Sequence, residues 1–340
     1  MSSFSAADAR GNLKANIATT ISNDAVAVII INSLTGGDYR QISALNAPYL
    51  ADGKTAPVPI VVVAPRYLSS LKASSKLAAL DVKGKYSSAR PFRSVYGRLR
   101  NSSDASAGGQ PGKGKTLCPR HASTRPNVLI TTPISGWHRC GGERGPGVAI
   151  LLALLRRLSQ SKSRCFNYHF IANSGHELSV ADGNLGLVQV NNTLQGDPCC
   201  ESREKSLLFT LKQTFKLLDK HAGRLNLDLK PQNTAVWLSL GASIATIDGM
   251  GKSAFSDASI GRAVSPALRR AGFSPTQLNK ADHGEVQAVR LKGYRTFGFD
   301  GAFSRFHTVA DDASSTNQVV LERALTGILE ALVQVTGEAL

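Results

Sequence analysis

The chain has few acidic residues and few aromatic residues for its length. Its 340 residues carry 24 aspartates and glutamates against 40 lysines and arginines, a formal charge of +16, and only 6% are aromatic. Such a charge attracts polyanions without selecting among them, and it steers acidic small molecules toward the protein. The densest basic stretch, Lys83 to Arg125, has little beyond Tyr86, Phe92 and Tyr96 on which bases could stack. We therefore favour a solvated basic face over a nucleic-acid groove, and we expect a small-molecule or peptide-like substrate.

Long apolar runs and cysteine motifs are also missing. No stretch of about 18 apolar residues marks a membrane span, and Met1 to Gly11 lack the apolar core of a secretion signal. The five cysteines are odd in number and form no Cys-x-x-Cys pair. This pattern predicts reduced thiols in a cytoplasmic protein that does not enter the membrane. The cysteines are Cys118, Cys140, Cys165, Cys199 and Cys200.

Apolar strands alternate with helices along the chain, and 42% of the residues are hydrophobic. This order predicts an α/β fold with a mostly parallel, twisted sheet and helices on both faces. We expect an N-terminal segment over 1–90, a basic mobile loop over 91–126 and the core over 127–340. The expected strands are 25–32, 57–64, 94–99, 128–131, 166–172, 295–299 and, with a glycine interruption, 235–247. The expected helices are 12–22, 67–80, 148–162, 205–220, 259–271 and the C-terminus from 315.

The basic loop contains a match to the phosphate-binding pattern G-x-x-x-x-G-K-[ST], from Gly109 to Thr116. That motif requires a buried strand before it and a helix after it, whose first amides face the phosphate. Polar residues precede this match, and Cys118-Pro119 follow it. We interpret it as a chance match.

Ionisable residues cluster at four places that follow expected strands or lie in adjacent loops. They are Glu143-Arg144, His176-Glu177, Asp282-His283, and His307 with Asp311-Asp312. In an open parallel sheet, ligands bind at the carboxyl ends of the strands. The sequence therefore predicts a composite site at that edge, assembled from segments far apart in the chain.

Over about residues 90–338 the chain resembles the di-zinc aminopeptidase and glutaminyl-cyclase family of exopeptidases. The resemblance rests on four segments in the family's order: Gly145 to Ala149, Gly175 to Leu178, Ala281 to His283, and Phe306 to Thr308 followed by Asp311-Asp312. It implies a zinc-exopeptidase-like fold. The N-terminal segment also looks like the protease-associated insert that some members carry.

Most of the metal-ligating positions that the resemblance implies are substituted. Pro133-Ile134-Ser135 stands in place of the family's His-x-Asp, and neither proline nor neutral serine replaces those zinc ligands. Glu143 occupies the place of the bridging aspartate, His176 that of the general base, and Ser239 that of a further aspartate ligand. We therefore expect a degenerate metal site that does not hold two zinc ions. A site for a single divalent metal such as zinc, bound by Glu143, Glu177 and His307, remains an alternative.

The candidate catalytic residues are Glu143, His176, Glu177 and His307, because carboxylates and imidazoles transfer protons near neutral pH. Each also has an ordinary structural interpretation: a carboxylate at a helix start favours the helix dipole, and a histidine at a strand end is common. Asp311-Asp312 could fix the tautomer of His307.

The candidate substrate-binding residues are Arg144, Trp137, Ser135 and Asp282. Arg144 could hold a substrate carboxylate through two parallel hydrogen bonds. Trp137 could line a pocket or be a structural tryptophan, and Asp282 could be a support. Ser135 lacks the G-x-S-x-G turn of a serine nucleophile, so we do not assign it that role.

Two main hypotheses remain open from the sequence, beside a third possibility, nucleic-acid binding, which predicts an affinity that collapses with salt. The first is a hydrolase-like or lyase-like enzyme that acts by acid-base chemistry on a small, anionic, amide-like or aminoacyl-like compound. The second is a catalytically inactive family member that binds a peptide, a small ligand or a polyanion.

Overall fold

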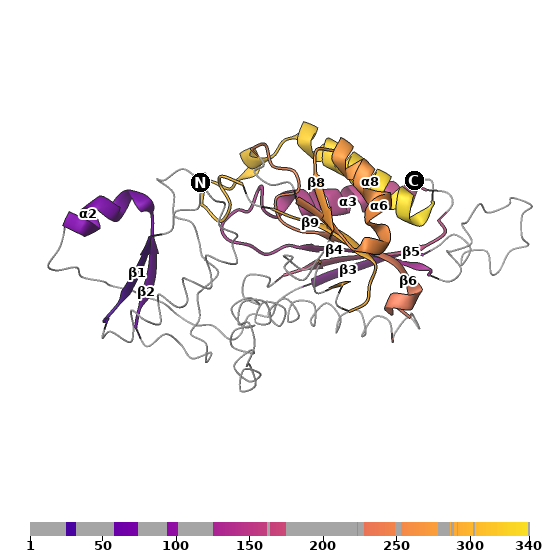
Figure 1. Ribbon diagram of the computed structural model, residues 1–340, viewed down its shortest axis with the longest axis horizontal. Helices are drawn as coiled ribbons and strands as arrows, with labels where there is room; N and C mark the ends of the chain where they lie inside the picture. Colours follow the sequence, from indigo (N-terminus) through magenta and orange to yellow (C-terminus); the bar gives the residue numbers. More distant parts are fainter. Residues whose placement is uncertain are drawn as a thin grey trace, which may run out of the picture.

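The computed structural model describes residues 25–31, 58–73, 94–100, 125–161, 164–174, 228–248, 253–277, 292–301 and 303–338, together with 223, 286, 289 and 290. Within them the chain forms a mixed α/β fold around one large sheet (Figure 1). The expected helices 12–22 and 205–220, and the phosphate-loop match at 109–116, lie outside the described residues.

The large sheet has seven strands in the order β3-β5-β4-β6-β9-β7-β8. β4 pairs in parallel with β5 and β6, β6 with β9, and β7 with β8, whereas β3 and β7 run antiparallel to β5 and β9. The prediction of a mostly parallel sheet is confirmed. The strands are β3 (Ser94–Leu99), β4 (Asn127–Pro133), β5 (Asn167–Asn173), β6 (Thr234–Leu240), β7 (Ser253–Ser256), β8 (Ser274–Gln277) and β9 (Thr296–Asp300).

Three long helices pack side by side on one face of this sheet: α3 (Gly145–Gln160), α6 (Ala258–Arg270) and α8 (Gln318–Thr336) (Figure 1). Their apolar stripes bury against alternate strand residues; Leu154, Ile328 and Val128 are all fully buried in this core. Every residue of β4 and β6 is buried, on both faces of the sheet. Burial on both faces is typical of central strands in a covered parallel sheet.

The N-terminal strands form a sheet of their own. β1 (Val28–Ile31) and β2 (Ile60–Val63) pair in parallel, with Val28 opposite Ile60. A short 3-10 turn (Pro65–Tyr67) and helix α2 (Leu68–Ala73) follow β2. The strand expected at 94–99 is β3, an edge strand of the large sheet.

The expectation of a strand over 235–247 is wrong beyond Leu240. β6 ends there, and residues 242–245 form a turn. Gly241 lies so close to β9 that a Cβ would be 2.0 Å from the carbonyl oxygen of Phe299. Within this turn Ser243 has a positive φ of 61°, which is uncommon for a residue other than glycine. β7 and β8 were not predicted; β8 includes Pro275, which suits an edge strand.

The cysteine prediction needs a correction. Cys165 takes part in a disulfide bond, whereas Cys140 is a free, buried thiol. Disulfides persist in oxidising compartments. The expectation that all five cysteines are reduced thiols is therefore wrong for Cys165. Among the described residues, no helix is long and apolar enough to cross a membrane. The compartment stays a prediction.

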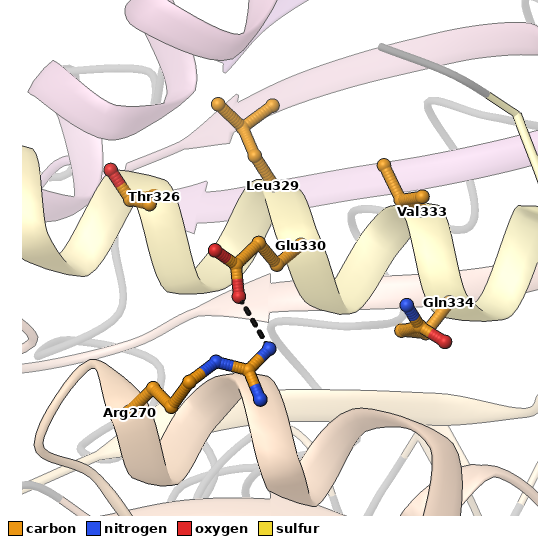
Figure 2. A pocket seen from close by; sticks show the side chains of 6 residues that line it. All are labelled: Arg270, Thr326, Leu329, Glu330, Val333 and Gln334. Atoms are coloured by element: carbon orange, nitrogen blue, oxygen red, sulfur yellow. Dashed lines mark hydrogen bonds and ion pairs between the residues drawn. The ribbon is translucent and has the colours of Figure 1, made fainter.

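The outer surface of the helical layer has a hollow of about 300 Å³ between α6 and α8 (Figure 2). Arg270 and Glu330 pair across it at 2.7 Å, and both side chains are well exposed, at 63% and 43%. An exposed pair of this kind contributes at most about 1 kcal/mol. The residues that line the hollow belong to the two helices, and none comes from a loop at the carboxyl ends of the strands.

Candidate functional site

Three loops at the carboxyl edge of the sheet bring the candidate residues together. Residues 134–144 follow β4, residues 241–248 follow β6, and residues 301–317 follow β9. Because β4, β6 and β9 are parallel neighbours, their following loops meet at the same edge.

Helix α3 begins very close to the strand ends. A Cβ on Gly147 would lie 2.6 Å from Thr132 Oγ1 and 3.1 Å from the carbonyl oxygen of Leu240, so only glycine permits this approach. Pro146 occupies the first turn, where its missing N–H is not needed. The two residues before the helix, Glu143 and Arg144, are thereby held against the sheet edge.

The side chain of Glu143 is the centre of the site and is fully buried. Its Oε1 lies 3.0 Å from Arg144 Nη2 and 3.3 Å from His307 Nε2. Arg144 is itself only 6% exposed, and its Nε donates to the carbonyl oxygen of Ser135 at 3.0 Å. A buried carboxylate is tolerated only when opposite charges or donors surround it. The structure thus places three residues predicted for the site in direct contact.

Asp311 does not have the role that the sequence suggested. Its carboxylate accepts hydrogen bonds from the backbone amides of Gly142, at 2.5 Å, and Glu143, at 3.1 Å. Asp311 therefore joins the loop after β9 to the loop after β4. The carboxylate that contacts the His307 ring belongs to Glu143. Burial raises the pKa of Asp311, and the two amide bonds partly offset that rise.

Cys140 is a neighbour that sequence reasoning did not assign to the site. Its thiol donates to the carbonyl oxygen of Trp137 and lies 3.6 Å from Glu143 Oε2. Burial, followed by the charges of Glu143 and Asp311, raises the pKa of this thiol well above its usual range. One ligand atom from each of Cys140, Glu143 and Asp311 falls within 4.8 Å of the others.

Unusual backbone conformations concentrate in the same loops. Cys140, Ser243 and His307 are not glycines, yet they have φ values of 50°, 61° and 62°. Cys140 and His307 lie 3.6 and 3.3 Å from the Glu143 carboxylate, and the backbone amide of Ser243 donates to the Glu143 carbonyl oxygen at 3.2 Å. Strained backbone persists where surrounding contacts enforce it, and it clusters at functional sites. No residue pattern that we considered in the sequence indicated these conformations.

The remaining candidates have separate outcomes. Ser135 and Trp137 lie in the loop after β4, where their carbonyl oxygens accept from Arg144 and Cys140. Their side chains are half-buried. His176, Glu177 and Asp282 lie outside the described residues, so their predicted roles stay predictions.

No protein-family model and no curated protein matches this chain. Among solved structures, a zinc aminopeptidase from Bacillus subtilis is similar at a TM-score of 0.52 and 14% identity, over 94% of this chain and 66% of that one. An aminopeptidase from Aneurinibacillus sp. strain AM-1 matches at 0.46 and 13% identity, over 98% and 67%. A Porphyromonas gingivalis glutaminyl cyclase matches at 0.39 and 12%, over 71% and 77%.

The likeness to the Bacillus subtilis enzyme supports an aminopeptidase-like α/β scaffold. The chain spans 44% of a putative peptidase from Clostridium acetobutylicum and 66% of the Bacillus subtilis aminopeptidase. At such identities the similarity concerns the fold, and the chemistry has to be argued from the site itself.

Proposed function

We propose that this protein is an enzyme on an aminopeptidase-like scaffold that works by acid-base chemistry at His307, on a small, anionic, amide-like or aminoacyl-like compound. The observation that carries the proposal is the buried carboxylate of Glu143, which holds both His307 and Arg144 at the carboxyl edge of the sheet. A histidine, a carboxylate and a guanidinium in contact are groups that transfer protons and bind anions.

In this proposal His307 transfers the proton and Glu143 positions it. Glu143 has no exposed surface, so it cannot touch a substrate, whereas the His307 side chain retains 10% exposure. Nε2 of His307 lies 3.3 Å from Glu143 Oε1, so the carboxylate restricts the position of the ring. In this proposal the imidazole is the group that takes and returns the proton. The ring also stacks on Phe306, with centroids 4.0 Å apart, which restricts its rotation.

Arg144 supports the preference for an anionic compound. Its guanidinium sits beside Glu143 in a nearly closed environment, where charge interactions are stronger than in water. A guanidinium is the side chain best suited to bind a carboxylate or a similar anion, because two parallel N–H donors match its two oxygens. The net charge of +16 would favour the approach of such a compound.

We infer that the described residues do not fit the two zinc ions of the aminopeptidase family. Pro133, Ser135 and Ser239 offer no imidazole or carboxylate at the strand ends. Asp311 already accepts two backbone amides, and Arg144 places a positive charge 3.0 Å from Glu143 Oε1. A cation at Glu143 would compete with that guanidinium. We therefore derive no step of the reaction through a metal.

The metal inference predicts less than one mole of zinc per mole of protein. Protein from zinc-supplemented cells would be dialysed at pH 7, analysed by inductively coupled plasma mass spectrometry, and assayed for thermal stability before and after chelator treatment. We expect the melting temperature to be unchanged by the chelator. Two tightly bound zinc ions per chain would contradict the inference.

The acid-base proposal predicts that His307→Ala lowers kcat/KM by about 100-fold or more, the usual effect of losing a general base. The assay would screen N-acyl and aminoacyl compounds, with and without a carboxylate, for one that wild-type protein converts. Glu143→Gln should lower kcat more than it raises KM, since it acts through His307. Ser159→Ala, on the exposed end of α3, is the control. Full activity of His307→Ala would reject the proposal.

A further inference from the structure

We propose that Asp311 is the positioning residue that sets the contact between Glu143 and His307, by fastening the loop after β4 to the loop after β9. This inference rests on the proposed function and names a further residue that its chemistry requires. Asp311 has no exposed surface, so it cannot touch a substrate. Any effect of Asp311 on the reaction must therefore act through the residues that it holds in place.

The carboxylate of Asp311 lies against three consecutive backbone amides just before helix α3. Gly142 donates to its Oδ1 at 2.5 Å and Glu143 to its Oδ2 at 3.1 Å. The amide of Gly141 donates to the main-chain carbonyl oxygen of Asp311 at 3.2 Å. Successive backbone N–H groups and the start of a helix both favour a negative charge. A carboxylate satisfies both side-chain contacts, whereas a side-chain amide would present an N–H group to one of the two donors.

The two loops meet with no room for side chains between their backbones. A Cβ on Gly141 would lie 2.0 Å from the main-chain carbonyl oxygen of Asp312, and one on Gly142 would lie 2.7 Å from the Phe303 ring. The glycine pair therefore lets the loop after β4 approach closely enough for its amides to reach Asp311. Backbone packing and hydrogen bonds thus act at the same place.

A short turn connects Asp311 to His307. The amide of Asp311 donates to the carbonyl oxygen of Thr308 at 3.1 Å, and the amide of Thr308 donates to that of Arg305 at 3.0 Å. On the other side of the link, Glu143 donates to the Asp311 carboxylate, and its own carboxylate lies 3.3 Å from His307. These contacts form a closed ring through both loops. Loss of the Asp311 carboxylate would open the ring where the two loops join.

A role for Asp311 as a metal ligand agrees less well with its contacts. Cys140, Glu143 and Asp311 each place a possible ligand atom within 4.8 Å of the others. Each carboxylate oxygen of Asp311, however, already accepts a backbone amide. Metal binding would also require the Cys140 thiolate, whereas burial and the nearby carboxylates raise the pKa of that thiol.

The test replaces Asp311 by asparagine, which keeps the size of the side chain but loses one of the two contacts. We expect kcat for the compound found in the screen to fall by about 10-fold or more, with KM changed by less than about twofold. Alkylation of Cys140 by iodoacetamide, followed by peptide mass mapping, reports on the same loop without a substrate. This thiol is buried 3.6 Å from the Glu143 carboxylate, so it should react about 10-fold or more faster in Asp311→Asn.

Asp257→Asn is the matched control, because Asp257 makes the same kind of link at the opposite edge of the sheet. Its carboxylate accepts from the amide of Ser259 at 2.8 Å and from that of Thr296 at 2.6 Å, which joins the start of α6 to the start of β9. Asp257→Asn should lower stability in urea, as a purely structural link does. It should leave kcat and the alkylation rate of Cys140 within about twofold of the wild-type values.

Amide hydrogen exchange on wild-type protein, followed by NMR, decides the matter even if Asp311→Asn does not fold. The amides of Gly142 and Glu143 should exchange about 100-fold or more slowly than in an unstructured peptide, and exchange at the unstructured rate would overturn the inference. So would Asp311→Asn with the kcat and alkylation rate of Asp257→Asn, and the acid-base proposal would then stand. Wild-type protein that converts no compound in the screen would overturn the proposed function. The alkylation and exchange rates alone would then decide whether Asp311 holds the loop.

Discussion

Replacing Arg144 by methionine is expected to lower the free energy of unfolding by about 3–5 kcal/mol, the usual cost of leaving a buried charge without its partner. Glu143 is fully buried, and Arg144 Nη2 lies 3.0 Å from its Oε1. Methionine retains much of the length and volume of the arginine stem, so the loss should come mainly from charge. Urea unfolding at pH 7 measures this loss.

The double variant Arg144→Met with Glu143→Gln separates charge from packing. If the two residues are coupled, the double variant should lose clearly less stability than the sum of the single losses. Arg270→Met provides a matched control, since that arginine forms an exposed pair with Glu330 at 2.7 Å. Its replacement should cost less than about 1 kcal/mol. Additive losses at Arg144 and Glu143 would contradict the buried ion pair as we describe it.

The parts of the fold that sequence predicted well are those with one dominant physical signal. The continuous apolar run at 128–131 and the helical spacing after Gly147 identify β4 and α3. The observed β4 is longer at both ends, and the observed α3 begins three residues earlier and ends two residues earlier than predicted. β7 and β8 gave no such signal, because short strands near a sheet edge, such as Ser-Pro-Thr-Gln at 274–277, are polar and brief. β7 pairs with β9, and β8 pairs with β7, so both strands depend on a neighbouring strand more than on their own residues.

From the sequence we could predict which types of residue form the site and at which edge of the sheet they lie. Rare ionisable residues after apolar strands pointed to Glu143, Arg144 and His307, and parallel pairing of β4, β6 and β9 explains why they meet. Their individual contacts were not predictable. The sequence suggested Asp311 as the partner of His307, but its carboxylate instead holds the loop of Glu143.

The strained backbone at Ser243 was not predictable either. Its φ of 61° comes two residues after Gly241, whose close contact with Phe299 joins residues about 58 positions apart in the chain. The pattern Gly-Ala-Ser-Ile-Ala is common enough that it carries little information without this conformation and the burial of its hydroxyl.

A second buried polar network, centred on His169 of β5, predicts a large dependence of stability on pH. Asn127 donates from Nδ2 to the carbonyl oxygens of Asp228 and Asn233, so its Oδ1 must face His169. His169 therefore donates from Nε2 and accepts at Nδ1 from the Tyr96 hydroxyl, 2.8 Å away. Burial, followed by the charge of Arg98, lowers the pKa of His169 to about 3.

The direction of the effect follows from comparing the two states. The unfolded chain binds a proton at His169 with a pKa of about 6.5, whereas the folded protein does so only near 3. Between these values the unfolded state holds more protons, so stability is complete above pH 6.5 and falls by about 1.4 kcal/mol per unit as pH decreases toward 3. The full loss across this window approaches about 5 kcal/mol. Burial of the neutral His169 ring is sufficient to cause this loss of stability.

Comparing wild-type protein with His169→Gln isolates this contribution. Glutamine can donate to Asn127 and accept from Tyr96, but it does not titrate. We expect urea unfolding curves recorded from pH 7 to pH 4 to show the wild-type protein losing about 3 kcal/mol more than the variant. Asp311 and Glu338, whose pKa values are raised by burial, act in the opposite direction and are common to both proteins. Parallel stability profiles would mean that His169 becomes protonated in the folded protein, and hence that this network opens to water.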